Sequence, residues 1–344
     1  MNNKVKIITD NREQVEAQAP IIISASRSTD IPAFYARWFL NRLQTGYSVW
    51  VNPFNQKSIY VAFNKVKAVV FWSKNPKPIT PYLHELDARG IHYYFQFTLN
   101  DYDEQLEPNV PSLEERIETF KDISEKIGKE KVIWRFDPLV MTDKIGVDEL
   151  LRKIENIGNQ LKEHTEKLVF SFADIGGIYK TVANNLKRLK INSHEFTPYA
   201  MNEFAKGLRV LNINWHFSLA ACAERIDLEQ YGIKHNRCID GDLMKRIFAK
   251  DTDFVYYLSY GKLPEKNHLS PLEIPKKEVN LKDKGQRGPC GCIISKDIGM
   301  YNTCPHFCAY CYANSSKKTV EDNRKNYAEN GESIIIKRPK QIWR

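Results

Sequence analysis

The stretch that decides the fold is residues 91–138. It opens with the apolar run Ile91-His-Tyr-Tyr-Phe-Gln-Phe-Thr98, continues through a polar, helix-forming segment at 112–127, and returns to the apolar run Lys131-Val-Ile-Trp-Arg-Phe136. Near-continuous apolar runs are typical of strands that are buried on both faces, as in a parallel sheet. Two such strands joined by a helix form a strand–helix–strand unit with a right-handed crossover. This stretch therefore predicts an α/β fold around a parallel sheet.

The same alternation of strands and helices repeats on both sides of this stretch. Further strands are expected at residues 21–26, 48–51, 59–63, 68–73, 167–173, 213–220 and 290–296. Further helices are expected at residues 31–44, 81–89, 147–162, 179–189, 197–211, 224–233, 240–249 and 316–329. Polar side chains recur where most of the strands end, and α/β barrels build their active sites at that end. We therefore predict a parallel (β/α) barrel of the TIM type, partial or complete.

Length and composition fit this fold. The chain has 344 residues, of which 42% are hydrophobic, so it can bury a core of barrel size. We expect a barrel core at 1–220, a cysteine-containing extension and connector at 221–288, and the last barrel strand, a cysteine loop and a basic tail at 289–344. There is no uninterrupted apolar run of membrane-spanning length, and the N-terminus is polar, so we expect a cytoplasmic protein without a membrane partner.

The net charge of +9 is concentrated in two segments, residues 276–287 and 317–344. One interpretation is a solvated surface with a basic tail. The other is an electrostatic footprint for nucleic acid or another polyanion. Charge alone does not choose between them.

The most specific local pattern is Cys304-Pro-His-Phe-Cys308-Ala-Tyr-Cys311. Three thiolates spaced C-x3-C-x2-C can ligate three irons of a [4Fe–4S] cubane and leave the fourth iron without a protein ligand. The alternative is a structural zinc site that takes His306 or a distant residue as its fourth ligand.

This loop resembles the signature of the radical S-adenosylmethionine (SAM) superfamily, including the aromatic Tyr310 before the third cysteine. The resemblance extends to Tyr-Phe-Gln-Phe-Thr-Leu-Asn at 94–100, Leu-Glu-Pro-Asn at 106–109, Glu-Arg at 115–116 and Trp-Arg-Phe-Asp-Pro at 134–138, which are similar to the spore photoproduct lyase branch. Across nearly its full length the chain resembles an uncharacterised bacterial family, domain of unknown function 1848.

The resemblance implies a function and a cofactor set. It implies a [4Fe–4S] cluster on Cys304, Cys308 and Cys311 that binds SAM and cleaves it to a 5′-deoxyadenosyl radical, which abstracts hydrogen from an unknown substrate. It also implies an electron donor such as flavodoxin or ferredoxin, and a place for Tyr310 beside the SAM adenine. The alternative function is a non-catalytic iron–sulfur or zinc protein that binds nucleic acid.

The position of the loop departs from the superfamily pattern. In radical SAM enzymes the cysteine loop follows the first strand, whereas here it follows the last. We therefore expect a circularly permuted barrel whose first strand is supplied from about residues 292–296; permutation is tolerated where chain termini lie close together at the surface. The alternative is a cluster-binding appendage beside an unrelated barrel.

Four cysteines remain: Cys222, Cys238, Cys290 and Cys292. Four thiolates complete the ligand set of one zinc ion or of a closed iron–sulfur cluster. We expect them to converge if the strand near residue 292 pairs beside the strand at 213–220. The alternative is that they are ordinary buried thiols. With all seven cysteines divided in this way, no lone cysteine is left as the hydrogen donor that the spore photoproduct lyase branch often uses.

Contacts to SAM are expected from polar residues at the predicted strand ends. A carboxylate needs a cation, and the ribose needs hydrogen-bonding groups. The candidates are Lys74, Gln96, Arg135 and Ser171, together with Tyr310 from the loop. For Arg135 the alternative is an internal salt bridge with Asp137.

Overall fold

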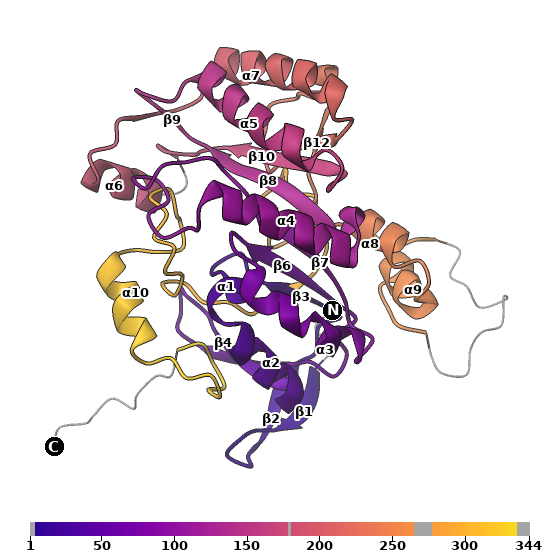
Figure 1. Cartoon of the computed structure of the whole chain (residues 1–344). Helices are drawn as coiled ribbons and strands as arrows, with labels where there is room; N and C mark the ends of the chain where they lie inside the picture. The colour runs from indigo at the N-terminus through magenta and orange to yellow at the C-terminus, as the bar shows by residue number, and fades with distance from the viewer. Residues whose placement is uncertain (1–3, 178–179, 265–276, 336–344) are drawn as a thin grey trace.

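The computed structural model describes residues 4–177, 180–264 and 277–335. Its centre is an eight-stranded sheet in which every neighbouring pair is parallel (Figure 1), with the order β13-β12-β10-β8-β7-β6-β3-β14. In chain order these strands are β3 (Ile22–Ala25), β6 (Ala68–Ser73), β7 (His92–Thr98), β8 (Val132–Leu139), β10 (Lys167–Phe172), β12 (Ser218–Ala221), β13 (Ile233–His235) and β14 (Lys296–Asp297). The predicted parallel α/β fold is thus confirmed.

The last strand of the chain lies beside the first strand of this sheet. In the register of the pair, Lys296 of β14 is opposite Ile23 of β3. The described strands do not close into a barrel, because β13 and β14 remain at the two edges. A backbone hydrogen bond of 3.0 Å from Ile293 N to Ile239 O joins the segments next to these edges.

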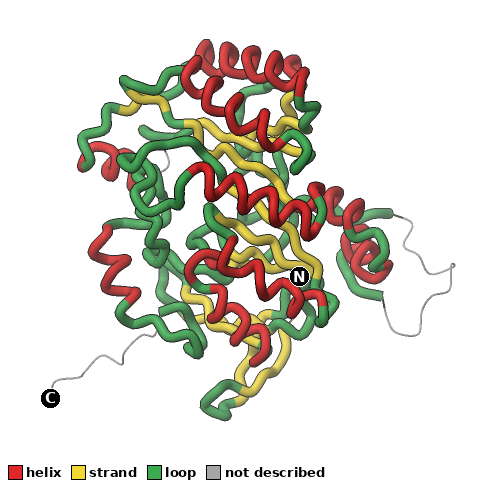
Figure 2. Tube along the Cα trace, in the orientation of Figure 1, coloured by secondary structure: helices red, strands yellow, loops and turns green. Residues whose placement is uncertain are grey.

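Helices cover one face of the sheet, as Figures 1 and 2 show for α2 to α5. The helices before β12 are α1 (Ile31–Phe34), α2 (Ala36–Thr45), α3 (Leu83–Asp87), α4 (Leu113–Ile127), α5 (Val147–Leu161), α6 (Lys180–Arg188) and α7 (Pro198–Leu211). Short 3-10 helices lie at Lys77–Tyr82, Lys129–Lys131, Asn212–Asn214 and Glu229–Tyr231. The start of α4 is fixed by a capping box between Ser112 and Glu115, which satisfies two otherwise unpaired backbone N–H groups.

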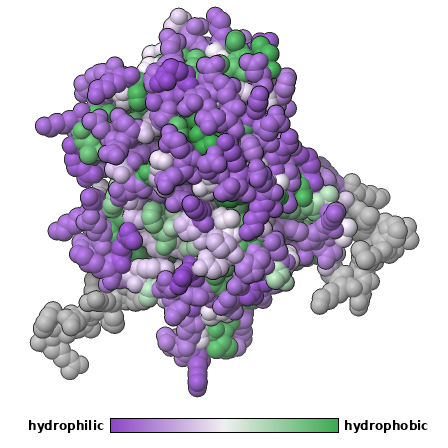
Figure 3. Space-filling model, in the orientation of Figure 1, coloured by the Kyte–Doolittle hydropathy of each residue, from purple (hydrophilic) through white to green (hydrophobic). Residues whose placement is uncertain are grey.

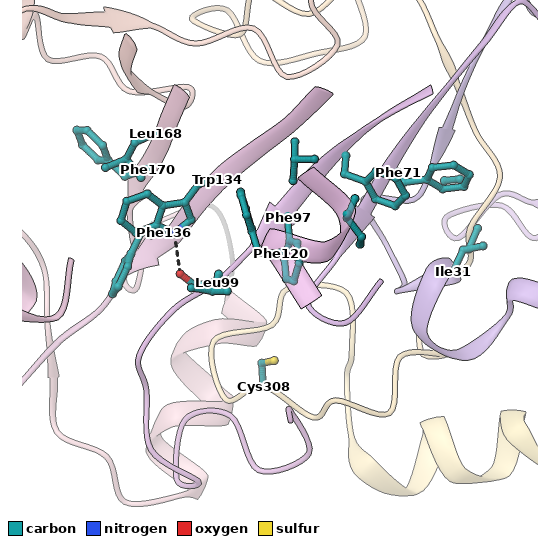
Figure 4. Packing of buried hydrophobic residues seen from close by; sticks show 14 of the residues in the cluster. Ile31, Phe71, Phe97, Leu99, Phe120, Trp134, Phe136, Leu168, Phe170 and Cys308 are labelled. Atoms are coloured by element: carbon teal, nitrogen blue, oxygen red, sulfur yellow. Dashed lines mark hydrogen bonds between the residues drawn. The ribbon is translucent and has the colours of Figure 1, made fainter. Parts of the chain in front are cut away.

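The core beneath these helices is aromatic. Alternate residues of the strands, such as Phe97, Trp134 and Phe170, point toward the helices and are fully buried. The indole N–H of Trp134 donates a 2.9 Å hydrogen bond to the carbonyl oxygen of Leu99 (Figure 4). This bond satisfies a polar group that would be costly to bury unpaired.

The second face of the sheet is covered by α8 (Gly241–Ile247) and α9 (Thr252–Tyr260). The opposite set of alternate strand residues packs here against Met244 of α8 and Phe254 of α9; this set includes Ile22, Val70, Tyr94, Ile133, Val169 and Ala220. Because side chains alternate along a strand, the residues two positions further on lie on the same face, near the carboxyl ends of the strands. They include Trp72, Gln96, Arg135, Ser171 and Cys222.

Two smaller sheets and one helix complete the described structure. The four-stranded sheet β1-β2-β5-β4 consists of β1 (Lys4–Ile8), β2 (Gln14–Gln18), β4 (Tyr47–Val51) and β5 (Ser58–Ala62). The predicted strands at 48–51 and 59–63 form the antiparallel pair of β4 and β5. The antiparallel pair of β1 and β2 was not anticipated, because polar residues interrupt the apolar ones in both strands. The last elements are the strand pair β9 (Met141–Thr142) and β11 (Ser193–His194), and the helix α10 (Lys317–Arg324).

Three predictions after residue 220 are wrong. Residues 224–233 are not a helix: one 3-10 turn ends at Gly232, whose φ of 77° favours glycine, and β13 follows. Only Lys296 of the predicted strand at 290–296 is in a strand. The strand β14 pairs with β3 rather than with the strand after α7, which has β13 as its neighbour. Of the predicted connector, residues 265–276 lie outside the described residues.

The outer surface is mainly hydrophilic on the face that Figure 3 shows, with hydrophobic side chains in small separate areas. Within the described ranges, no helix combines the length and the apolar character that a membrane crossing requires.

Candidate functional site

The cysteine loop follows β14 and lies across the carboxyl ends of neighbouring strands. The hydroxyl of Tyr35 donates a 2.5 Å hydrogen bond to the carbonyl oxygen of Thr303, and Tyr312 donates one of 2.7 Å to Arg27 O. The backbone N–H of Ala309 bonds Leu106 O at 2.9 Å. The partners come from the segments that follow β3 and β7, so the loop lies at the end of the sheet where α/β proteins bind their ligands.

Of the three thiols of the loop, Cys308 is buried and Cys304 and Cys311 are half-buried. They are close enough to affect one another's pKa. Burial raises the pKa of Cys304, Cys308 and Cys311, and for Cys308 to about 12. The other two thiols raise the pKa of Cys304 further, as does Asp30. A metal centre replaces these protons when it binds, because the thiolate is the ligand.

His306 has partners at both ring nitrogens. Nδ1 lies 2.9 Å from Asn109 O, and Nε2 lies 2.9 Å from Oδ2 of Asp30. In this arrangement neither nitrogen is open to a metal, so His306 does not serve as the fourth ligand of a zinc site. Moreover, within the described part of the chain, no three His, Cys, Asp or Glu side chains converge as ligands of a single ion.

A buried group of polar side chains lies beside Cys308; we call Lys74, Asn100, Glu107, Arg116 and Tyr310 the Glu107 cluster. Lys74 Nζ is 2.7 Å from Oε1 of Glu107, and Arg116 Nη1 is 3.5 Å from its Oε2. The Tyr310 hydroxyl donates to Glu107 and accepts hydrogen bonds from Lys74 at 2.8 Å and Asn100 at 3.0 Å. The Glu107 side chain is only 1% exposed, so these contacts must hold its charge in place of water.

The Glu107 cluster carries two cations and one anion. Burial alone would raise the pKa of Glu107, but Lys74 and Arg116 hold it below its usual value. The pKa of Lys74 is raised, because Glu107 outweighs the effect of burial. Lys74 also opposes the rise in the pKa of Cys308. Burial has the larger effect and Glu107 adds to it, so the pKa of Cys308 stays at about 12 and Lys74 offsets only part of the rise.

A second polar group surrounds Arg135. Its guanidinium pairs with Asp137, with Nη2 2.5 Å from Oδ2, and donates a 3.1 Å hydrogen bond to Gln96 Oε1. Ser171 donates to the other oxygen of Asp137, and Gln96 Nε2 donates to Cys238 O at 2.8 Å. Burial would raise the pKa of Asp137, but Arg135 and Ser171 lower it. The internal salt bridge that the sequence left open for Arg135 is therefore present.

The predicted SAM contacts lie in these two groups. Lys74 and Tyr310 are in the Glu107 cluster, and Gln96, Arg135 and Ser171 are together near Cys238. The two groups are joined by a 2.9 Å hydrogen bond from Asp137 N to Oδ1 of Asn100. All five predicted residues have partners within the protein, and their contacts with SAM stay predictions.

Sequence reasoning gave no role to several residues that complete the site. Glu107 and Asn100 connect the loop to the strand ends. The carboxylate of Asp30 accepts a 2.7 Å hydrogen bond from the backbone N–H of Lys74 and also contacts His306. Asp30 and Asn100 each follow a predicted strand within a few residues, and Glu107 lies in the Leu-Glu-Pro-Asn stretch at 106–109; these are the signals that could have identified them. In the described part of the basic tail, residues 317–324 form α10. Residues 336–344 lie outside the described residues, as does residue 276. Nucleic-acid binding stays a prediction.

The four remaining cysteines converge on the second face of the sheet. Cys222 Sγ and Cys238 Sγ are 3.3 Å apart. The thiol of Cys292 interacts with those of both Cys238 and Cys290. The seven cysteines therefore occupy two separate groups, one of three and one of four.

Comparison with known proteins identifies one family. The family model described as "Domain of unknown function (DUF1848)" matches residues 22–313. The match begins with the first residue of β3 and ends two residues after Cys311, so it contains the eight-stranded sheet and the cysteine loop. Neither the comparison with curated proteins nor that with solved structures gives a match. The chain belongs to the DUF1848 family.

Proposed function

We propose that this protein is a radical SAM enzyme. In this proposal Cys304, Cys308 and Cys311 ligate three irons of a [4Fe–4S] cluster, and the fourth iron is left for SAM. The observation that carries the proposal is the group of three neighbouring thiols, one buried and two half-buried, at the carboxyl ends of parallel strands, with His306 already committed to Asp30 and Asn109. A cubane holds its thiolates farther apart than one ion does, which agrees with the lack of a single-ion site among the described residues.

We further propose that the sheet is a permuted radical SAM barrel in which β14 takes the place of the first strand. The pairing of β14 with β3 supports this assignment. Asp297 of β14 accepts hydrogen bonds from Ser24 Oγ at 2.9 Å, Ser26 Oγ at 2.7 Å and Arg27 N at 2.8 Å. These bonds fasten the strand to the end of β3, so the loop that follows it starts at the carboxyl edge of the sheet.

The residues of the chain have separate tasks in this proposal. The thiolates hold the cluster, which when bound supplies the electron that cleaves SAM to a 5′-deoxyadenosyl radical and methionine. The Glu107 cluster keeps Lys74 charged and next to Cys308, where its ammonium can neutralise the SAM carboxylate. Tyr310 is held by hydrogen bonds to Glu107 and Lys74 and fixes the loop against the sheet. The bound cofactors would thereby supply hydrogen abstraction from an unknown substrate, with electrons from a donor such as flavodoxin or ferredoxin.

The test is SAM cleavage by the whole chain after anaerobic reconstitution and reduction with dithionite. We expect 5′-deoxyadenosine from the wild-type protein and none from Cys308→Ala. Ser124→Ala is the matched control, because it removes one buried heteroatom from α4, where the Ser124 hydroxyl donates to His164 O, and it should still form the product. A wild-type protein that carries a full loop cluster yet forms no 5′-deoxyadenosine would overturn the proposal in favour of a non-catalytic iron–sulfur protein.

A further inference from the structure

The four cysteines outside the loop form a contiguous group, which we call the four-thiol group: Cys222, Cys238, Cys290 and Cys292. They come from three separate segments of the chain. Cys222 directly follows β12, and Cys238 lies three residues after β13. Because β12 and β13 are parallel neighbours, their carboxyl ends bring these two thiols to 3.3 Å.

The other two thiols are brought in by backbone contacts. The hydrogen bond from Ile293 N to Ile239 O places Cys292 next to Cys238, and the 2.9 Å bond from Asp283 N to Cys292 O holds the same segment from its other side. The thiol of Cys290 in turn interacts with that of Cys292. The group is thus assembled by the tertiary fold.

Three N–H groups donate to the sulfurs of this group. Arg135 Nη1 is 3.1 Å and Asn236 Nδ2 is 3.0 Å from Cys238 Sγ, and Ile239 N is 3.3 Å from Cys292 Sγ. A thiol is a weak acceptor, whereas a thiolate accepts charge-assisted hydrogen bonds. Neighbouring thiols and burial raise the pKa of Cys222, Cys238 and Cys292, so these donors suit thiolates that a metal centre holds rather than free thiolates.

Two further donors nearby have no acceptor within the protein. Trp72 lies between two guanidinium groups, with Arg27 Cζ and Arg135 Cζ each 5.2 Å from its ring centroid. Nη2 of Arg27 and Nε1 of Trp72 are both buried and make no hydrogen bond. Burial lowers the pKa of the Arg27 guanidinium, but Cys292 and Asp297 raise it. An unpartnered buried donor is costly, which points to a bound group that supplies acceptors here.

The number of acceptors distinguishes the two candidate metal centres. A zinc ion with four thiolates offers only the cysteine sulfurs, whereas an iron–sulfur cubane adds inorganic sulfides that accept hydrogen bonds. Two arginines also match the negative charge of a cluster with four thiolates.

We infer that the four-thiol group binds a closed [4Fe–4S] cluster, with Arg27, Arg135 and Trp72 facing it. This inference does not rest on the function proposed for the cysteine loop. The Cys222 and Cys238 sulfurs move apart from 3.3 Å when the cluster binds, since the irons of a cubane separate their ligands.

The test is the metal content of the full-length Cys308→Ala protein, in which the loop site is disabled. Iron, acid-labile sulfide and zinc are measured after anaerobic purification and again after reconstitution. We expect about four irons and four sulfides per chain in this protein, and none after Cys292→Ala is added. Stoichiometric zinc, or no metal at all, in a folded Cys308→Ala protein would overturn the inference. The result does not depend on SAM, so it can fail while the proposed function holds.

A second variant leaves all four thiols in place and so avoids a folding defect caused by their loss. In the Cys308→Ala background, Arg27→Gln removes one positive charge and one donor, and we expect the reduction potential of the remaining cluster to become more negative. Arg42→Gln is the matched control, because Arg42 is also buried but pairs with Asp10 at 3.0 Å instead of facing the thiols. Equal potentials for the two variants would contradict the place given to Arg27.

Discussion

Glu107→Gln is expected to destabilise the protein more than any loss of a surface ion pair, because it leaves two buried cations with no anion. At an effective dielectric constant of about 20, unit charges 2.7 and 3.5 Å apart attract by about 5–6 kcal/mol each. Desolvation offsets part of this attraction, and removing one partner of a buried pair typically costs about 3–5 kcal/mol. We expect a loss of about 3–5 kcal/mol in the free energy of unfolding at pH 7, measured by urea denaturation of the metal-free protein.

The matched control is Glu118→Gln on α4, the helix that carries Arg116. Glu118 lies 3.1 Å from Lys121 but is 68% exposed, so its loss should cost less than about 1 kcal/mol. The pKa of Glu107 is lowered in the folded state, so its contribution is complete above the unfolded value of 4.5 and is lost as the pH falls through the folded value. The difference between Glu107→Gln and wild type should therefore shrink in acid. An equal loss in the free energy of unfolding for Glu107→Gln and Glu118→Gln at pH 7 would refute the stabilising role given to the buried ion pairs of Glu107.

Two further predictions concern stability away from the cysteines. Burial lowers the pKa of Lys296 to about 8. The charge of Lys296 therefore lowers stability below pH 8, and this cost disappears as the pH rises from 8 to the unfolded pKa of 10.5. Lys296→Met, which keeps the aliphatic part of the side chain against Trp50, should raise the free energy of unfolding by about 1–3 kcal/mol at pH 7 and by little at pH 10.5. A gain of the same size at both pH values would contradict this assignment. At Gly158 in α5 an added Cβ would lie 2.5 Å from the Trp215 ring. Gly158→Ala should therefore lower the free energy of unfolding by about 1–3 kcal/mol, measured by thermal or urea unfolding. Gly288→Ala is the control and should be nearly neutral, because a Cβ there would meet no atom within 4 Å.

The parallel sheet was predictable because most of its strands are near-continuous runs of apolar residues. Runs such as residues 91–98 and 131–136 are apolar on both faces, and only a sheet covered on both sides accommodates them. The strands β1 and β2 have no such continuous apolar run, since polar residues alternate with apolar ones in both, and they pair mainly with each other. The strand β13 is only three residues long, and its place is set by pairing with β12 rather than by its own sequence.

The cysteines of the candidate site were predictable from the sequence, whereas the polar residues that surround them were less so. The spacing of Cys304, Cys308 and Cys311 is local, so the sequence alone displays it. The contact of Glu107 with Lys74 and Tyr310 joins segments that are far apart in the chain, and no local pattern encodes it. The convergence of the four-thiol group was predicted from a strand pairing that is not present; it arises instead from β13 and from the backbone bond between residues 239 and 293.

The central claim is that the loop leaves one iron of its cluster open to SAM. The most direct measurement is electron–nuclear double resonance on the reduced, reconstituted protein with SAM labelled by ¹⁵N at its amino group and ¹⁷O at its carboxylate. We predict hyperfine coupling of both labels to the cluster in the wild-type protein and its loss in Cys308→Ala. The absence of coupling in wild-type protein that carries a full loop cluster, or zinc in place of iron at the loop, would contradict the account.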